Sequence, residues 1–234
     1  MPTKSQVSKK VLFFGRAGCA RSKEAISFLN ENGFETTCLI SKGRNDDLTE
    51  QVAQWRGDYI FCFRSVYILN ASEIAQARVA AINFHPGPPE RRGTGCLNFA
   101  LYYNDREYGV TSHLIAAEID AGPVLGCWRF PIAVNDTVDT LLSRTHEQLL
   151  RAFREFIGAL VDQGDEYIEL ACKRFKRERW SGPLFKKQDL DQLSHLDQNC
   201  TRAEMNRVIR ATHTKEFPTT LSFNGHIFGL LQPK

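Results

Sequence analysis

The sequence lacks any regular arrangement of cysteines. Its seven cysteines are an odd number scattered along 234 residues, with no Cys-x-x-Cys pair and no group of cysteines and histidines at metal-site spacing. Cys38 and Cys62 lie within apolar runs, where a free thiol behaves as a small hydrophobic side chain. This usage excludes a disulfide-stabilised secreted scaffold. It predicts a cytoplasmic protein, in a reducing compartment, that binds no metal ion.

Long hydrophobic runs are also missing. The polar N-terminus is followed by an apolar run at residues 11–14, which is too short for a signal peptide, and no later run reaches the length needed to cross a bilayer. The charge is nearly balanced, with 30 Lys and Arg against 27 Asp and Glu and a net charge of +3. A protein that binds nucleic acid through its phosphates is usually more basic. We therefore expect neither a membrane nor a nucleic acid as a partner.

The first two thirds of the sequence alternate short apolar runs with amphipathic stretches. Strands that alternate with helices are typical of βαβ units, in which a parallel sheet is covered by helices on both faces. The fold class is therefore predicted to be α/β, with a Rossmann-like, mostly parallel sheet. The expected strands lie at residues 11–14, 35–40, 59–63 and 79–84, and the expected helices at 20–31, 46–55 and 71–77.

The remainder predicts two further strands, a long helix and a small second unit. Composition shifts after Gly164, and Asn224-Gly225 is the signature of a type I′ turn in a hairpin at residues 219–231. Exposed apolar residues on such a small appendage favour a homodimer. We predict an α/β catalytic domain at residues 1–163 and an α+β appendage at residues 164–234 that ends in the β-hairpin. Between these landmarks we expect helices at 96–104 and 138–160 and strands at 108–116 and 124–131.

Polar side chains follow a buried strand between residues 81 and 120. Asn83 and His85 are two positions apart, so on a strand they point to the same side, and they lie where open α/β sheets bind ligands. Asp120 lies on a later, glycine-containing loop. An amide, an imidazole and a carboxylate can together stabilise an oxyanion and move a proton, as acyl transfer to an amine requires. By residue type alone, the same side chains are also compatible with ordinary hydrogen bonding in loops and turns.

Four motifs in a fixed order make the interpretation specific. They are Asn83-Phe84-His85, a loop rich in proline and glycine that contains Arg92-Gly93, then Gly109-Val110-Thr111, and then Asp120-Ala121-Gly122. In this order they resemble the formyltransferases that use 10-formyltetrahydrofolate, a family that includes methionyl-tRNA, glycinamide ribonucleotide and sugar N-formyltransferases. The resemblance is strong over residues 59–131 and weaker over residues 9–58, and it implies the formyltransferase fold.

The resemblance also implies roles for individual residues. Asn83, His85 and Asp120 would be the catalytic residues, with Asn83 and protonated His85 stabilising the oxyanion and Asp120 supporting proton transfer. The cosubstrate would be 10-formyltetrahydrofolate, with no metal ion. The residues that bind this cosubstrate would be Arg64, Ser65, Val66, Tyr67, Ile68, Leu69, Ala116 and Ile119.

The chain after residue 164 resembles the C-terminal part of the nucleotide-sugar N-formyltransferases. The similar stretches are Gly182-Pro183-Leu184, Ile209-Arg210-Ala211-Thr212 and Phe217-Pro218. The resemblance implies that the acceptor is a nucleotide-linked amino deoxysugar. This would be a dTDP- or GDP-linked 3-amino or 4-amino dideoxyhexose for a surface polysaccharide such as the O-antigen of lipopolysaccharide. The residues expected to bind it are Pro86, Arg92, Gly93, Thr94, Trp180, Arg210 and Phe223.

The identity of the acceptor stays open at this point. Many relatives have a Ser-Leu-Leu-Pro-like loop after the histidine, where this chain has Pro86-Gly87-Pro88-Pro89. Glycinamide ribonucleotide or another small amine is one alternative acceptor, and water, in a formyltetrahydrofolate deformylase, is another. The basic run at residues 173–179 suggests a non-catalytic RNA- or nucleotide-binding module as a third. Aromatic and basic side chains of the tail are also compatible with packing of the hairpin or with a solvated face.

A glycine-containing turn follows the first predicted strand. Gly15-Arg16-Ala17-Gly18 lacks the third glycine of a dinucleotide-binding motif in register. We interpret it as a strand-to-helix turn rather than as a dinucleotide site.

Overall fold

The computed structural model describes residues 8–43 and 46–231 and confirms the predicted α/β fold. At its centre lies a six-stranded sheet in the order β2-β1-β3-β4-β6-β7. The first four strands in this order are parallel, whereas β6 pairs antiparallel with both β4 and β7. The strands are β1 (Lys10–Arg16), β2 (Glu35–Ser41), β3 (Gly57–Phe63), β4 (Ala77–His85), β6 (Glu107–Leu114) and β7 (Val124–Pro131).

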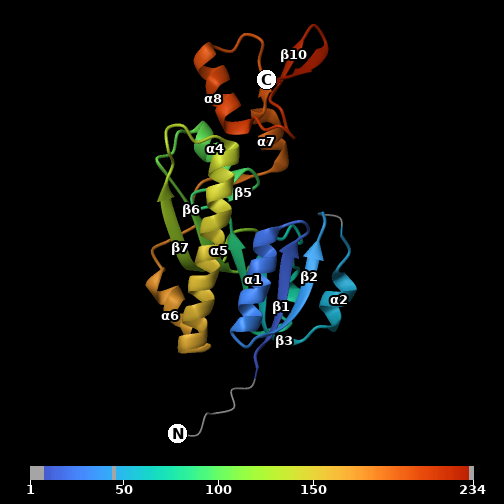
Figure 1. Cartoon of the computed structure of the whole chain (residues 1–234), viewed down its shortest axis with the longest axis vertical. Helices are drawn as coiled ribbons and strands as arrows, with labels where there is room; N and C mark the ends of the chain where they lie inside the picture. Colours follow the sequence, from blue (N-terminus) through green and yellow to red (C-terminus); the bar gives the residue numbers. More distant parts are fainter. Residues whose placement is uncertain (1–7, 44–45, 232–234) are drawn as a thin grey trace.

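Helices cover both faces of this sheet. Helices α1 (Ala20–Glu31) and α5 (Val138–Gln163) cross one face, as Figure 1 shows, and α2 (Thr49–Gln54) and α3 (Ala71–Ile74) pack on the other. Because side chains alternate along a strand, Phe13 of β1 packs under α1 and α5, and Phe14 packs on the opposite face. Burial of both faces explains why β1 is apolar without alternation. Within the described ranges, no helix combines the length and apolar character that crossing a membrane requires.

The C-terminal part forms a small α+β unit at one end of the molecule, at the top of Figure 1. Its three-stranded sheet has the order β11-β10-β9, and Asn224 and Gly225 have φ angles of 48° and 79°. These positive angles confirm the predicted type I′ hairpin turn. The elements are α7 (Lys187–Leu193), β9 (His195–Leu196), α8 (Arg202–Thr212), β10 (Thr220–Phe223) and β11 (His226–Gly229).

Helix α6 (Glu166–Arg174) packs with the catalytic domain rather than with the hairpin. Ala171 is buried in the core that also holds Phe153 and Phe156 of α5. Tyr167 and Ile168 cover the edge of the same core. The division at residue 163 remains a prediction, and we propose that the catalytic domain extends through α6.

Two short strands join the C-terminal part to the catalytic domain. β5 (Arg92–Gly93) follows the proline-rich loop, lies before α4 (Cys96–Tyr102), and pairs in parallel with β8 (Leu184–Phe185). A Cβ atom on Gly93 would lie 2.2 Å from the carbonyl oxygen of Phe185, so this close pairing requires glycine. The chain after residue 180 therefore returns to the loops that follow β4.

Candidate active site

A cavity of about 720 Å³ lies at the carboxyl ends of β3 and β4, a size typical of small-molecule sites. Its wall combines the end of β4, the segments at residues 64–69 and 115–120, and the start of α4. All eight residues predicted to bind the formyl donor line it: Arg64, Ser65, Val66, Tyr67, Ile68, Leu69, Ala116 and Ile119.

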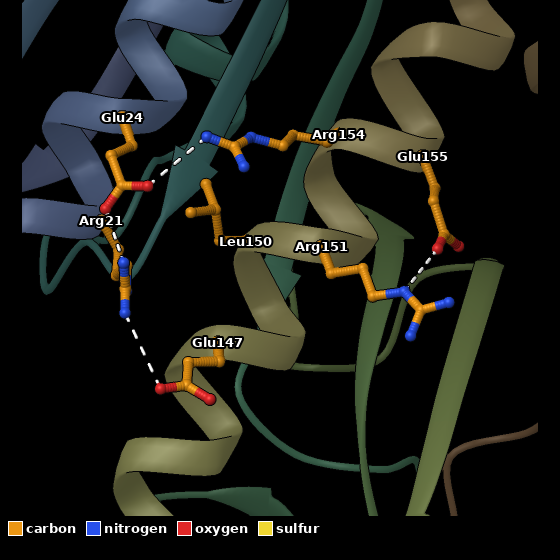
Figure 2. A pocket seen from close by; sticks show the side chains of 7 residues that line it. All are labelled: Arg21, Glu24, Glu147, Leu150, Arg151, Arg154 and Glu155. Atoms are coloured by element: carbon orange, nitrogen blue, oxygen red, sulfur yellow. Dashed lines mark hydrogen bonds and ion pairs between the residues drawn. The ribbon is translucent and has the colours of Figure 1, made fainter.

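A second hollow of about 290 Å³ lies between α1 and α5 (Figure 2). Its side chains are paired with one another. Arg21 contacts Glu24 and Glu147, and Arg154 also contacts Glu24. Arg151 pairs with Glu155 one helical turn away. All six charged side chains that line this hollow are thus paired within it, and it presents no unpaired charge to a ligand among the described residues.

The structure brings the three predicted catalytic side chains together in the larger cavity. Asn83 and His85 point to the same side of β4, as their spacing predicts. The Nδ1 atom of His85 lies 3.5 Å from Oδ2 of Asp120. Asp120 is buried, has a left-handed backbone with a φ angle of 47°, and accepts a 2.9 Å hydrogen bond from the Gly93 N–H. A non-glycine residue held in this conformation often marks a functional position.

A second histidine, His113, completes the group and was missed by the sequence interpretation. β6 pairs Asn83 opposite His113, and the Asn83 Nδ2 atom lies 3.1 Å from His113 Nε2. The His113 Nδ1 atom lies 2.8 Å from the Leu114 carbonyl oxygen, to which its N–H donates. His113 Nε2 is also 3.6 Å from Asp120 Oδ1. His113 lies two positions beyond the Gly109-Val110-Thr111 motif, but it meets Asn83 only through the antiparallel pairing of β6 with β4, which no local pattern shows.

The environment of His85 favours its protonated form. Burial alone lowers the pKa of this imidazole, but the Asp120 carboxylate, together with Cys96 and the Arg91 carbonyl, raises the pKa to about 9. His85 Nε2 donates to the Arg91 carbonyl at 3.0 Å, and Nδ1 faces Asp120. Both ring N–H groups of an imidazolium therefore have acceptors.

Asp120 is correspondingly held as a carboxylate. Burial raises its pKa, but the neighbouring His85, His113 and the Gly93 N–H outweigh burial and hold the pKa well below its ordinary value. The wall thus presents an amide, an imidazolium and a carboxylate, which can stabilise an oxyanion and accept a proton. In the part of the chain that the structure describes, no group of three or more His, Cys, Asp or Glu side chains is placed to hold a metal ion.

The predicted acceptor-binding residues divide into two sets. Pro86, Gly93 and Thr94 line the cavity. Arg92 does not, and its guanidinium instead donates to the Ile119 carbonyl at 3.0 Å, beside Asp120. This contact holds the loop that carries the carboxylate.

The other three predicted acceptor-binding residues do not line the cavity: Trp180, Arg210 and Phe223. Arg210 of α8 donates to the Asp136 and Ala133 carbonyls and to the Asn104 side chain, which ties the C-terminal unit to the main domain. Phe223 lies on the exposed hairpin. Trp180 packs against the His85 and His113 rings and does not line the cavity. These positions result from tertiary packing that local sequence patterns do not encode.

Cationic side chains that the motifs did not identify line the cavity beside the segment at residues 64–69. Arg16 and Arg64 form no ion pair with a carboxylate within the described ranges; the Arg64 guanidinium lies 3.0 Å from the Cys19 sulfur. Arg64 also has a left-handed backbone, with a φ angle of 57°. Burial, followed by the charges of Arg64, Arg16 and Arg21, lowers the pKa of nearby His146 to about 4. A cavity wall with two guanidinium groups that have no carboxylate partner among the described residues is suited to an anionic ligand.

Comparisons with known proteins agree with this arrangement. The family model for "Formyl transferase" matches residues 5–157. Methionyl-tRNA formyltransferase of Synechococcus elongatus is 29% identical over 152 residues, which are 64% of this chain and 45% of that enzyme. The chain therefore spans less than half the length of this curated relative.

Solved structures match over nearly the whole chain. A candidate sugar N-formyltransferase from Mycobacterium tuberculosis superposes with a TM-score of 0.75 at 20% identity, over 97% of this chain and 99% of that one. An N-formyltransferase from Helicobacter canadensis, in complex with folinic acid and dTDP-3-aminofucose, gives a TM-score of 0.69 at 19% identity, over 93% and 85% of the two chains. At these identities the similarity establishes the shared fold, including the C-terminal part.

Proposed function

Since the chain belongs to the formyl transferase family, whose model matches residues 5–157, we propose that it transfers a formyl group from 10-formyltetrahydrofolate to the amino group of a nucleotide-linked amino deoxysugar. The observation that carries the proposal is the convergence of Asn83, His85 and Asp120 in one cavity wall. The cavity, with a volume of about 720 Å³ and residues 64–69 along its wall, is large enough for a folate.

The side chains of the site can support each chemical step of such a transfer. The acceptor amine attacks the formyl carbon, and the carbonyl oxygen becomes negative. The Asn83 amide N–H can donate to this oxygen, and the positive charge of the His85 imidazolium, whose N–H groups face Arg91 and Asp120, can stabilise it electrostatically. Asp120, which is ionised, can take up the proton that the attacking nitrogen loses and pass it to N10 of the folate as the bond between N10 and the formyl carbon breaks.

A phosphorylated acceptor is supported by charge and by similarity. The resemblance assigned Arg64 to the formyl donor, but we propose that its guanidinium, with that of Arg16, faces the phosphates of the acceptor, because both line the cavity without carboxylate partners among the described residues. Guanidinium groups bind phosphate in bidentate fashion. The structurally similar Helicobacter canadensis enzyme was crystallised with dTDP-3-aminofucose. The choice of sugar, the link to surface polysaccharide and the cytoplasmic location stay predictions.

We expect Arg64→Asn to raise KM for the nucleotide-linked acceptor by about 10-fold or more, because hydrogen bonds to charged groups are the strong ones. Asparagine tolerates the left-handed backbone at this position, so the change removes charge without adding strain. Steady-state kinetics with each substrate varied in turn would measure it. Arg151→Asn, an exposed arginine outside the cavity, is the matched control. A rise in KM for the folate alone would assign Arg64 to the formyl donor instead.

The proposal is tested by measuring tetrahydrofolate release from 10-formyltetrahydrofolate. The acceptors would be a panel of dTDP- and GDP-linked amino sugars, with glycinamide ribonucleotide and a reaction without acceptor alongside. Release that requires one amino sugar, with a formylated sugar as product, is the expected result. Turnover with glycinamide ribonucleotide would keep the family and change the acceptor. Release without any acceptor would indicate a deformylase, and no turnover at all would contradict the proposal.

We also propose that the hairpin mediates a homodimer. Ile227 and Phe228 of β11 are 73% and 53% exposed, and β11 lies at the edge of its sheet. An open edge with exposed apolar side chains can pair with a second copy. We expect sedimentation equilibrium to give twice the mass of one chain, and Ile227→Asp to give a single-chain mass. Val134→Asp, at a position 97% exposed elsewhere, should leave the mass unchanged. A single-chain mass for the unaltered protein would contradict the dimer.

A further inference from the structure

The segment from Trp180 to Phe185 is hydrogen-bonded to the two loops that support the catalytic residues. The Trp180 indole N–H donates to the Gly122 carbonyl at 2.7 Å, and the Ser181 N–H donates to the Pro89 carbonyl at 3.0 Å. At its other end, the Phe185 carbonyl accepts from the Thr94 N–H at 2.8 Å. The segment therefore holds the two loops that follow β4 and β6, which between them support His85 and Asp120.

The Trp180 ring packs directly on the catalytic imidazoles. Its centroid lies 4.8 Å from that of His113 and 5.6 Å from that of His85, with interplanar angles of 83° and 76°. Both histidines line the cavity, whereas Trp180 does not. The indole therefore contacts both histidines without lining the cavity, so it is not placed to contact a ligand there.

We propose that Trp180 is a positioning residue for formyl transfer. It orients His85 and Asp120, and it shields the His85 and His113 rings from water on the side where the indole packs. This inference rests on the proposed function for its kinetic consequences. Its structural part concerns the state of His85 and holds whichever acceptor is used.

The effect of Trp180 on Asp120 runs through the backbone. Gly122 is two residues beyond Asp120, and a Cβ atom at position 122 would lie 1.9 Å from the Leu114 carbonyl oxygen, so the loop passes very close to the end of β6. The hydrogen bond from the indole fixes the Gly122 carbonyl in this tight turn. Losing it lets the loop move, and small displacements of a catalytic group have large effects on rate.

The effect of Trp180 on His85 is electrostatic. The titratable groups that face His85 are Asp120 from the loop after β6 and Cys96 from α4, with His113 on the far side of the carboxylate. The attraction between Asp120 and the imidazolium is strong because both are buried. If water reached the imidazole, this attraction and the cost of burial would both shrink. The pKa of His85 would then move down toward the ordinary histidine value of about 6.5.

The test compares Trp180→Leu and Trp180→Phe with Trp128→Phe. Trp128 is the matched control, because its indole N–H also donates to an oxygen, that of Glu155, but outside the cavity. For each full-length variant, the titration of His85 is followed by NMR of ¹⁵N-labelled imidazoles. Thermal unfolding and the kcat and KM for formyl transfer are measured in parallel. Phenylalanine keeps an aromatic ring over the histidines and removes only the hydrogen bond.

We expect Trp180→Leu to lower the His85 titration midpoint by about one pH unit or more. We expect it to reduce kcat by about 10-fold or more, with both KM values within about 3-fold of the unaltered protein. Trp180→Phe should keep the midpoint near that of the unaltered protein and lose part of kcat, and Trp128→Phe should change neither quantity.

Two results would overturn the proposal. One is an unchanged His85 midpoint in both Trp180 variants. The other is a raised KM for the acceptor with kcat retained, which would make Trp180 an acceptor-binding residue. If the unaltered protein transfers formyl to none of the acceptors, the proposed function fails. The imidazole titration then still decides the role of Trp180.

Discussion

Replacing His85 with alanine should lower kcat for formyl transfer by about 1,000-fold, because the change removes the positive charge that stabilises the oxyanion and leaves the Asp120 carboxylate without its cationic partner. His85 is the one ring in the cavity wall whose two nitrogens face the Arg91 carbonyl and the Asp120 carboxylate. Among the residues the structure describes, none can take over both contacts: His113 is already bound to the Leu114 carbonyl and Asn83. Single-turnover kinetics at saturating concentrations of both substrates would measure the loss in the chemical step.

The loss should arise without unfolding of the protein. His85 lies at the end of β4 and not in the aromatic core around Phe153, and the buried Asp120 keeps His113 and the Gly93 N–H as partners. Thermal unfolding of the variant should therefore remain cooperative. His195→Ala, at an exposed position on β9, is the matched control and should keep full activity. A rate within about 3-fold of the unaltered protein for His85→Ala would be incompatible with the assigned role.

The main sheet could be predicted because its strands are buried on both faces. Strands such as β1 and β3 appear in the sequence as continuous apolar runs bounded by polar or glycine residues, and their positions follow directly. β5 and β8 have two residues each and show no periodicity. They exist because Gly93 allows the backbone of the tail to approach closely, which is a tertiary contact.

The catalytic residues could be predicted for a related reason. Asn83 and His85 share one side of a strand whose end forms the ligand-binding edge, so spacing and position within the fold are enough to place them. Trp180 and Arg210 were placed at the acceptor on similarity alone, and the structure gives them other contacts. Both lie far along the chain from the groups they touch. No local pattern could have shown that Trp180 meets Gly122 or that Arg210 meets Asp136.

Replacing Asp120 with asparagine tests the charge of this residue separately from its shape. The asparagine oxygen can still accept from the Gly93 N–H, but the negative charge beside His85 is lost. We expect kcat at pH 7 to fall by about 100-fold to 10,000-fold, because the proton acceptor is removed and His85 is no longer held protonated. The double variant with His85→Ala should be little slower than the slower single variant, because residues that act as a unit are not additive.

The pH dependence gives Asp120→Asn a signature that simple damage would not produce. In the unaltered protein the pKa of His85 is about 9, so the rate should hold across neutral pH and fall as the pH rises through about 9. Without Asp120, burial is opposed only by Cys96 and the Arg91 carbonyl, so the pKa of His85 falls below about 9, and the alkaline limb of the profile should move to lower pH.

The free energy of unfolding should also fall as the pH rises through the pKa of His85, and this change can be measured without substrate. A histidine whose pKa is raised on folding contributes stability that is complete below its unfolded pKa of about 6.5 and is lost as the pH rises through about 9. Thermal unfolding of the unaltered protein should therefore weaken over this window. Asp120→Asn should abolish that change, and it should also abolish the loss of stability on acidification that arises from the depressed pKa of Asp120. An unaltered alkaline dependence in Asp120→Asn would mean that another group holds His85 protonated, and the pairing of His85 with Asp120 would have to be abandoned as the source of its charge.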